Sequence, residues 1–253
     1  PRYLPLYAGL STFRMVSAYL LSLLFSFSYG YLASRSPFWE RILIPLLDIL
    51  QSVPMLSFLP LFLLILIQIF PLRVAAELTS IFLIFTCQGW NITFSWYQSL
   101  ITLPKEYEES AKIFRFNGWL KFKKIDLPFG AMGIIWNSMV SWAGGWFFLM
   151  AAEMFVIENR DFRLPGLGSY LQKAASSGNV KYVILGVVTL FALIIILDQF
   201  VWKPLICWAE RFKPAKDGQT TSWFYNIIRS SRLIDFFQKK ILNNIIEGLD
   251  RFF

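Results

Sequence analysis

The sequence predicts an all-α integral membrane protein that crosses the bilayer several times. Hydrophobic residues make up 56% of the 253-residue chain and charged residues only 16%, whereas about a quarter of the residues in a soluble domain are charged. The mean hydropathy is +0.53. Several stretches reach the length of about 20 mostly apolar residues that a helix needs to cross a bilayer.

Five stretches qualify as transmembrane helices. The first carries only Arg14, the second only Asp48, the third only Glu77 and the fifth only Asp198, while the fourth is uncharged. The five spans are expected at about residues 11–33, 42–70, 74–101, 129–152 and 182–202. Together with their loops they form a predicted transmembrane domain over residues 1–206.

The basic residues between the spans predict the orientation. If the loop 102–128 is cytoplasmic, 17 Lys and Arg residues lie inside and 6 outside, which fits the excess of basic residues in cytoplasmic loops. The predicted outside segments are the N-terminus, 71–73 and 153–181. The net charge is +8, but the basic residues lie between apolar segments and are not clustered on one soluble domain. We therefore expect no nucleic-acid partner. An upstream helix would be needed if the full protein starts in the cytoplasm.

Neither a disulfide nor a metal site is expected. Cys87 and Cys207 lie in or beside apolar stretches, so we expect free thiols. Histidine, the commonest metal ligand, is absent. No cofactor is therefore expected in this chain.

The second span contains several prolines. Pro54 and Pro60 each remove a backbone donor and disturb the preceding helical turn. Irregular backbone at membrane depth is tolerated against protein or a wet cavity. Gln51, Ser52 and Pro54 are therefore candidates for a translocation path, and a tightly packed kink without a transport role is an equal alternative.

The fourth span is rich in small residues, which let helices approach closely in lipid. We expect it at the centre of the bundle. Asn137, Ser141, Trp142, Gly144 and Gly145 are its candidates for the translocation path. The tryptophan is as well suited to packing as to gating.

Single charges near the span ends are candidates for function because a charge in lipid is costly. For Asp48 and Glu77 we favour a helix-end or interhelical polar contact. Glu153 is a candidate for the outer mouth of a translocation path. It is also a candidate anchor for the loop that contains Gly166 and Gly168, which is the interpretation we favour.

The loop 102–128 predicts a short helix, a turn and a second short helix. Pro104 suits a helix start, and Tyr107, Ala111 and Phe114 share one face. Asn117-Gly118 marks the turn. Such an element can dock into a groove on a soluble partner, or it can be an ordinary solvated basic loop.

The tail 207–253 changes character. Apolar residues recur at helical spacing in its second half, which predicts an amphipathic helix on the inner membrane surface. The alternative is a connector to a second membrane unit.

Motifs in the loop carry a resemblance to a known family. Glu109-Ser110-Ala111, followed by Gly118 and 125–128 (Ile-Asp-Leu-Pro), resembles the Glu-Ala-Ala loop of binding-protein-dependent ABC importer permeases. In that family the loop forms coupling helices that sit in a cleft of the ATP-binding subunit. The resemblance assigns ATPase coupling to Glu108, Glu109, Ser110, Ala111, Arg115 and Gly118. Ser110 replaces the usual middle alanine, and the family's glycine aligns with Arg115, so a different turn shape is expected.

Four further segments match the family in the expected order. Residues 11–14 resemble the family's opening, and residues 45–54 with 59–61, 151–154 and 164–168 are similar to runs in permeases for nitrate, taurine, sulfonates and related compounds. The resemblance covers about residues 10–206. The tail lies outside it, and the chain would be one half at most of a fused two-unit permease.

The resemblance implies the fold and function of a type I importer permease in a bacterial-type inner membrane. A small solute, such as nitrate, a sulfonate or bicarbonate, would cross by alternating access. ATP and Mg²⁺ would bind a separate ATPase coupled through residues 104–124, because the chain lacks a phosphate-binding loop motif. The other implied partners are a second permease unit and a periplasmic or lipid-anchored binding protein. The alternatives are an ion-gradient-driven transporter or channel and, less favoured, a membrane-embedded enzyme.

Overall fold

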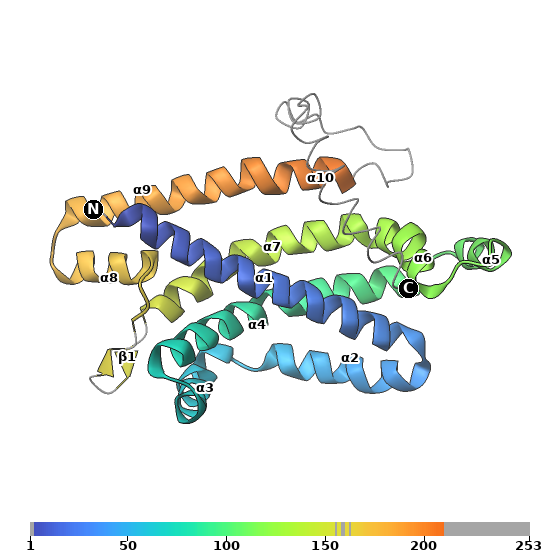
Figure 1. Cartoon of the computed structure of the whole chain (residues 1–253), viewed down its shortest axis with the longest axis horizontal. Helices are drawn as coiled ribbons and strands as arrows, with labels where there is room; N and C mark the ends of the chain where they lie inside the picture. The colour runs from blue at the N-terminus through green and yellow to red at the C-terminus, as the bar shows by residue number, and fades with distance from the viewer. Residues whose placement is uncertain (1–2, 155, 158–159, 162, 210–253) are drawn as a thin grey trace. The chain divides into compact units, whose positions relative to one another are not determined.

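The structure is a computed structural model that describes residues 3–154, 156–157, 160–161 and 163–209 (Figure 1). Nearly all of the elements in this part of the chain are helices, which confirms the predicted all-α class. The exception is a short antiparallel pair of strands, β1 (Val156–Ile157) and β2 (Arg160–Asp161). The predicted amphipathic tail lies outside the described residues from residue 210 onward.

Six long helices contain the predicted spans. They are α1 (Leu4–Arg35), α2 (Pro37–Ser52), α3 (Met55–Ile69), α4 (Leu72–Ile101), α7 (Leu127–Glu153) and α9 (Val180–Leu197). Shorter elements connect and extend them. These are α5 (Lys105–Ile113), α6 (Gly118–Lys121), the π-helical turn η1 (Phe122–Asp126), α8 (Leu167–Ser176), the π-helical turn η2 (Asp198–Trp202) and α10 (Lys203–Ala209).

Among the described residues, three helices are long and apolar enough to cross a membrane. These are Leu4–Arg35, Leu72–Ile101 and the continuous helix Val180–Ala209, and the bent pair α2 and α3 adds a fourth if it forms one span. The sequence predicted five. The remaining predicted span, the fourth, lies in α7, which is 27 residues long, and its crossing of the membrane stays a prediction.

The second predicted span is broken rather than continuous. Residues Pro37–Ser52 and Leu56–Ile69 form two helices that meet at an angle of 99°. Val53 is extended, with φ −71° and ψ 125°, because a proline disfavours helical backbone at the residue before it. Pro54 thus ends one helix, whereas Pro45 and Pro60 lie inside α2 and α3.

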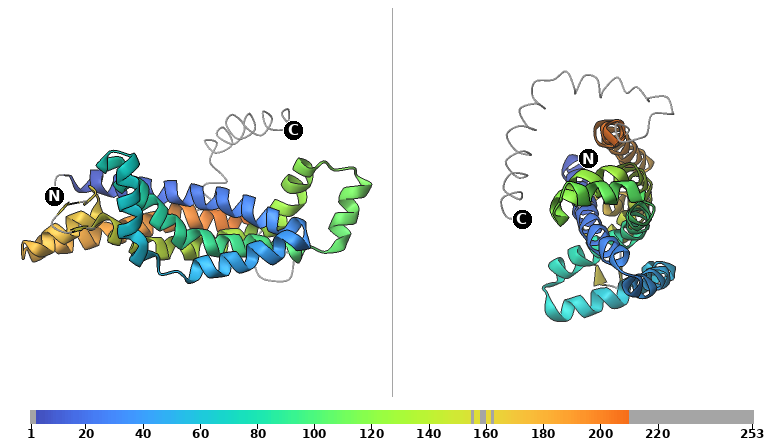
Figure 2. Two further views of the ribbon diagram at one scale, coloured as in Figure 1. Left: turned by 90° about the horizontal axis from the view of Figure 1, so that it is seen from below. Right: turned by 90° about the vertical axis from the view of Figure 1, so that its right-hand side faces the viewer.

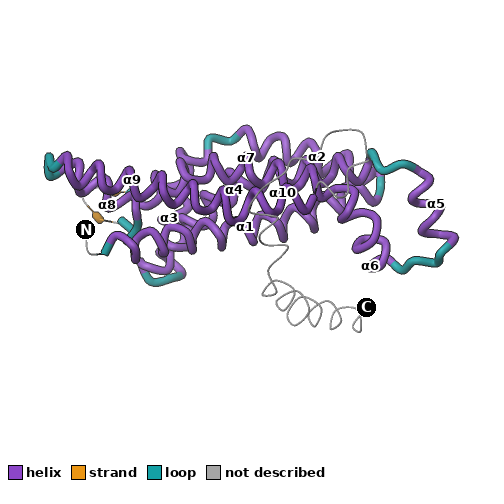
Figure 3. The backbone as a smooth tube through the Cα atoms, turned by 90° about the horizontal axis from the view of Figure 1, so that it is seen from above, coloured by secondary structure: helices purple, strands orange, loops and turns teal. Residues whose placement is uncertain are grey.

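The chain divides into two compact units, residues 1–102 with 136–195 and residues 103–135 with 196–253. In the first unit α1 and α4 lie side by side (Figures 2 and 3). Small residues permit this close packing. A Cβ added at Gly30 would lie 2.7 Å from Trp96 Cδ1, and the hydroxyls of Ser26 and Thr93 are 2.8 Å apart. These contacts fix α1 against α4.

Candidate functional site

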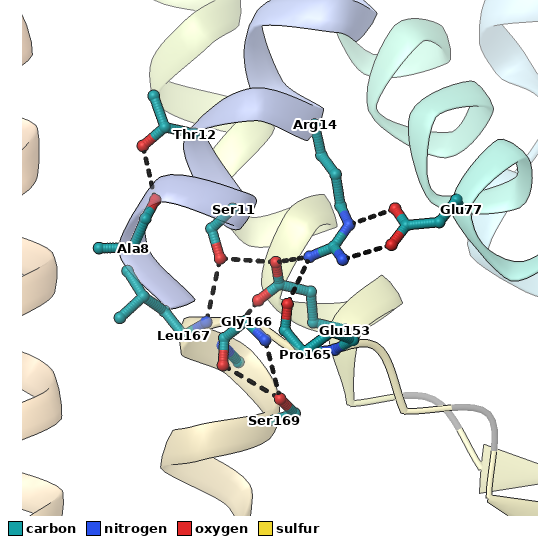
Figure 4. Close-up of polar contacts among 11 residues, drawn as sticks. Ala8, Ser11, Thr12, Arg14, Glu77, Glu153, Pro165, Gly166, Leu167 and Ser169 are labelled. Carbon is teal, nitrogen blue, oxygen red and sulfur yellow. Dashed lines mark hydrogen bonds and ion pairs between the residues drawn. The ribbon is translucent and has the colours of Figure 1, made fainter. Parts of the chain in front are cut away.

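A buried arginine in α1 is the centre of an ion-pair network in the first unit (Figure 4). The side chain of Arg14 is 1% exposed. Its Nε donates to Glu77 Oε2 and its Nη2 to Glu77 Oε1, both at 2.6 Å. This bidentate geometry is the strongest form of an Arg–carboxylate contact. It ties α1 to α4.

The second carboxylate of the network is Glu153 at the end of α7. Its side chain is 0% exposed, and Arg14 Nη1 donates to its Oε1 at 2.7 Å. Ser11 Oγ donates to the same oxygen at 2.6 Å, and the backbone N–H of Gly168 donates to Oε2 at 2.8 Å. The last contact ties Glu153 to the first turn of α8, and a role of Glu153 in a translocation path stays a prediction.

The loop before α8 makes further backbone contacts with α1. Arg14 Nη1 donates to the carbonyl of Pro165 at 3.0 Å. The N–H of Leu167 donates to Ser11 Oγ, also at 3.0 Å. Because buried polar groups are costly when unpaired, these bonds make the loop part of the network.

Two glycines, which have no side chain, make room for the network. A Cβ added at Gly166 would clash with the carboxylate of Glu153, and one at Gly168 would lie 2.9 Å from the carbonyl oxygen of Met150. The loop can approach α7 this closely only because both positions lack a side chain.

The network joins α1, α4, α7 and the loop before α8 through one cation and two carboxylates. A buried charge is stable only when it is paired and hydrogen-bonded. Loss of one member of the network would therefore leave its partner incompletely paired and destabilise the fold. Each carboxylate is bound by Arg14, an arrangement that suits a structural clamp better than a general acid. The described residues contain no cluster of His, Cys, Asp and Glu that could hold a metal ion.

The residues predicted for the translocation path lie in separate places. Gln51 and Pro54 line a pocket of about 340 Å³ at the break between α2 and α3, together with Cys87 and Trp90 of α4. Ser52 and Pro54 line a second pocket of about 550 Å³. Cys87 is a free thiol, as expected.

The path candidates of α7 lie against α1 and α4 in the first unit. Ser141 Oγ accepts a hydrogen bond from Asn91 Nδ2 at 3.2 Å. Trp142 packs edge-on against Tyr19, with ring centroids 5.6 Å apart, and Asn137 is half-buried. A Cβ added at Gly145 would lie 2.8 Å from the side-chain amide nitrogen of Gln88, and one at Gly144 would lie 3.4 Å from Cys87 Sγ. These contacts show close packing, and the role of these residues in a path stays a prediction.

The residues predicted for ATPase coupling lie in the second unit, on α5, α6 and the turn between them. Glu108, Glu109 and Ser110 are exposed on α5, and Ala111 is buried. Lys121 Nζ lies 3.4 Å from Glu108 Oε1, an ion pair that connects the two short helices.

Arg115 has a backbone conformation that glycine favours. Its φ is +51°, in the left-handed region that costs other residues about 1–2 kcal/mol. Its N–H donates to the carbonyl of Lys112 at 3.1 Å, and that of Phe116 donates to Ala111 at 2.9 Å. These two bonds form a Schellman motif.

The glycine of the Glu109-Ser110-Ala111 motif, Gly118, does not lie in this turn. Gly118 is the first residue of α6, and a Cβ there would meet nothing within 4 Å. Asn117 caps α6 by accepting from the N–H of Leu120 at 2.7 Å. The turn signal at these two residues is therefore a helix start, and the turn itself is at Arg115.

Sequence reasoning missed the network as a unit. The sequence analysis identifies Arg14 only as the single charge of the first span and as part of a family resemblance, and Glu77 only as a charge that favours a polar contact. A signal was present, because the predicted topology places Arg14, Glu77 and Glu153 near the outer ends of three spans. Opposite charges at one depth predict an ion pair.

The comparisons with known proteins agree with the predicted fold. Residues 12–201 match the model of a family described as the binding-protein-dependent transport system inner membrane component. The chain belongs to this family. The match includes Arg14, Glu77 and Glu153 of the ion-pair network and the whole of the α5–α6 loop.

Several curated relatives are similar to the chain at low identity. The bicarbonate transport system permease protein CmpB of Synechocystis sp. is 24% identical over 186 residues, which are 74% of this chain and 62% of that protein. CmpB of Synechococcus elongatus is 23% identical over 199 residues, or 79% and 66%. The nitrate import permease protein NrtB of Leptolyngbya laminosa is 24% identical over 188 residues, or 74% and 63%. The chain thus covers less than two thirds of each of these relatives, all of which are named as transport permeases rather than enzymes.

Proposed function

We propose that this chain is a permease unit of an ATP-driven importer that moves a small anion, such as bicarbonate or nitrate, across an inner membrane. The family match and the names of the relatives support this proposal. They do not favour the ion-gradient-driven alternative. We further propose that the loop 102–128 faces the cytoplasm, as the distribution of basic residues predicts.

The α5–α6 loop is the observation that carries the proposal. Ile113 is 76% exposed, Phe114 70% and Tyr107 50%, on short helices that otherwise present charged side chains. Large apolar side chains gathered on a hydrophilic loop indicate a partner surface. An amphipathic helix that lies in a groove is a common mode of such docking.

The partner that fits this surface is a separate ATPase that holds ATP and Mg²⁺. The loop continues through η1 directly into α7, so a force on α5 and α6 acts on the start of a 27-residue helix. The last residue of that helix, Glu153, belongs to the Arg14 network. Closure of the ATPases would thereby reorient α7 together with the helices that the network clamps to its end.

Import also needs partners that supply substrate and complete the path. The family description names a binding protein, which would deliver the anion from outside. A second permease unit, either a copy of this chain or the other half of a fused chain, would complete the path. The exposed polar residues Asp48, Gln51 and Ser52 of α2 would face this path or the second unit rather than lipid, since polar groups in lipid are costly.

Co-purification of the ATPase tests the docking role of the loop. Phe114→Asp places a charge in the proposed groove, so we expect the partner ATPase to be lost during purification. Glu109→Arg is expected to have the same effect. Tyr3→Asp is the matched control, because Tyr3 is a 66% exposed aromatic residue outside the loop, and the ATPase should be retained. A complex that survives both loop substitutions would overturn the proposal.

The substrate is tested by uptake into vesicles that contain the purified importer. We expect ATP-dependent accumulation of labelled bicarbonate or nitrate only when the binding protein is present. Uptake driven by an ion gradient without ATP would support the alternative instead.

A further inference from the structure

The two carboxylates of the Arg14 network differ in exposure. The side chain of Glu153 is 0% exposed, whereas that of Glu77 is 39% exposed. Glu77 lines a pocket of about 800 Å³ in the first unit, together with the start of α1, the loop before α8 and α8 itself. At about 30 Å³ for each water molecule, this pocket admits a small anion with its hydration shell. An anion in the pocket can therefore reach Glu77, whereas Glu153 is shielded from it.

The contact between Arg14 and Glu77 has the geometry of an oxyanion-binding site. Arg14 Nε and Nη2 donate to the two oxygens of one carboxylate, both at 2.6 Å (Figure 4). The planar guanidinium fork matches groups that present two oxygens in this arrangement, and nitrate and bicarbonate are planar anions of this kind. The carboxylate of Glu77 thus occupies the position that a planar oxyanion would take on this arginine.

The other ion pair of Arg14 does not depend on Glu77. Arg14 Nη1 donates to Glu153 Oε1 at 2.7 Å, and Glu153 Oε2 accepts from the backbone N–H of Gly168 at 2.8 Å. If an anion replaced the Glu77 carboxylate, Arg14 would still have two negative partners, so its buried charge would stay matched. The clamp between α1 and α7 would therefore persist through the exchange.

Arg73 provides a second partner for the displaced carboxylate. It lies four residues before Glu77 on α4, and side chains at this spacing are neighbours on the surface of a helix. Arg73 lines the same pocket, is exposed and forms no ion pair with another residue in the part of the chain that the structure describes. When Glu77 turns from Arg14 toward the pocket, it therefore exchanges one arginine for another.

We propose that Arg14 is a binding site for a planar oxyanion such as nitrate or bicarbonate, which takes the place of the Glu77 carboxylate. This inference rests on the proposed function and names a substrate contact of the permease. The distribution of basic residues predicts that the N-terminus and residues 71–73 lie outside, so the anion enters the pocket from that side.

The exchange has two consequences for transport. Binding of the anion releases the bidentate tie between α1 and α4, while Glu153 keeps α1 tied to α7. The site also selects by shape, because a planar oxyanion forms two bonds to the Arg14 fork and a spherical anion of the same charge does not.

Chemical rescue of a variant that lacks the Glu77 carboxylate tests the exchange. Glu77→Ala leaves two donors of Arg14 without an acceptor, so the full chain in lipid nanodiscs should unfold at a lower temperature than wild type in sodium chloride. Sodium nitrate or sodium bicarbonate at equal ionic strength should restore part of this loss. At ten times its Kd, the anion should raise the unfolding temperature of the variant by about 3–6 °C. Wild type should show a smaller shift, because Glu77 competes for the same donors.

Glu108→Ala is the matched control for the rescue. It also removes a carboxylate from an ion pair, but the partner is Lys121 and the side chain of Glu108 is 50% exposed. An ammonium group has no planar fork, so nitrate should shift this variant no more than wild type. The proposal would be overturned if nitrate and bicarbonate stabilised Glu77→Ala no more than chloride does. Equal shifts in wild type and Glu77→Ala would also overturn it, because the anion would then bind elsewhere.

Arg73→Gln provides a test that leaves the network intact. We expect the affinity for nitrate, measured from the unfolding temperature at increasing nitrate concentration, to fall at least about twofold, because the displaced Glu77 has lost its second partner. The same change should have a smaller effect in a Glu77→Gln background, where no charged side chain is displaced. Lys173→Gln removes another exposed cation of the pocket and should act equally in both backgrounds. Unchanged affinity of Arg73→Gln, or an effect of equal size in both backgrounds, would contradict the exchange.

ATP-dependent uptake by wild-type importer in vesicles is measured in parallel. Uptake without rescue of Glu77→Ala by either anion would overturn the exchange and leave the proposed function standing. Rescue by the anions without any ATP-dependent uptake would refute the proposed function and support the binding site at Arg14. The two failures are therefore distinguishable.

Discussion

The Arg14 network and the α5–α6 loop handle polar and apolar groups in opposite ways. In the network, two of the three charged groups are buried: the side chains of Arg14 and Glu153 are 1% and 0% exposed, and that of Glu77 is 39% exposed. In the loop, apolar groups are exposed, with Ile113 and Phe114 at 76% and 70%. Buried charges that bind one another hold a structure together, whereas exposed apolar groups need a partner to cover them. The contrast indicates internal clamping in the first region and supports the docking role that we propose for the second.

The largest expected effect comes from removing the cation of the network. Arg14→Leu leaves Glu153 buried without its ion pair, which costs about 3–5 kcal/mol in comparable cases. We expect most of the protein to aggregate on extraction or to unfold at a clearly lower temperature. Fluorescence-detected size exclusion with a temperature ramp measures this effect.

Two further variants sharpen this prediction. Lys181→Leu removes an exposed cation and should leave the unfolding temperature unchanged. Arg14→Leu combined with Glu153→Gln should recover part of the loss, because the second change removes the unpaired buried charge. A single Arg14→Leu variant as stable as wild type would show that the network is not a clamp.

A smaller effect is expected from the glycine that admits Glu153. Gly166→Ala adds a Cβ that clashes with the carboxylate, and overpacking of this kind costs about 1–3 kcal/mol. Gly118→Ala makes the same change where nothing lies within 4 Å and should be tolerated. Thermal unfolding of the two variants measures the difference, and equal stability would contradict the close approach of the loop to α7.

The smallest effect is expected at the turn of the α5–α6 loop. Arg115→Gly removes the left-handed strain at φ +51° and should stabilise the C-terminal end of α5 by about 1 kcal/mol. Hydrogen exchange at the amides of positions 115 and 116 should slow by roughly fivefold. Arg115→Ala keeps the Cβ and should show no such protection. Equal protection in both variants would mean that loss of the Arg115 charge, rather than the backbone conformation, determines the stability of the turn.

Helix positions could be predicted because lipid imposes them locally. The stretch 74–101 falls inside α4 (Leu72–Ile101), and 129–152 falls inside α7 (Leu127–Glu153). The break at Pro54 also had a local cause, although its angle of 99° depends on packing that a single sequence does not contain.

The network could be predicted only in part because its members are far apart in the chain. Arg14 contacts a residue 139 positions away, and nothing local to Ser11 or Arg14 specifies that partner. The Arg115 turn is the opposite case, because its contacts are local in the chain. The family's glycine aligned with this residue, and its positive φ lies in the region that glycine favours.

The most direct test of the central claim is the accessibility of the α5–α6 loop. Ile113→Cys, in a background with Cys87→Ala and Cys207→Ala, provides a single thiol at a 76% exposed position. A membrane-impermeant maleimide should leave it unlabelled in intact cells and label it in inverted vesicles stripped of the ATPase. Adding the ATPase back should protect it. Labelling from outside intact cells, or labelling that the ATPase does not change, would contradict the account.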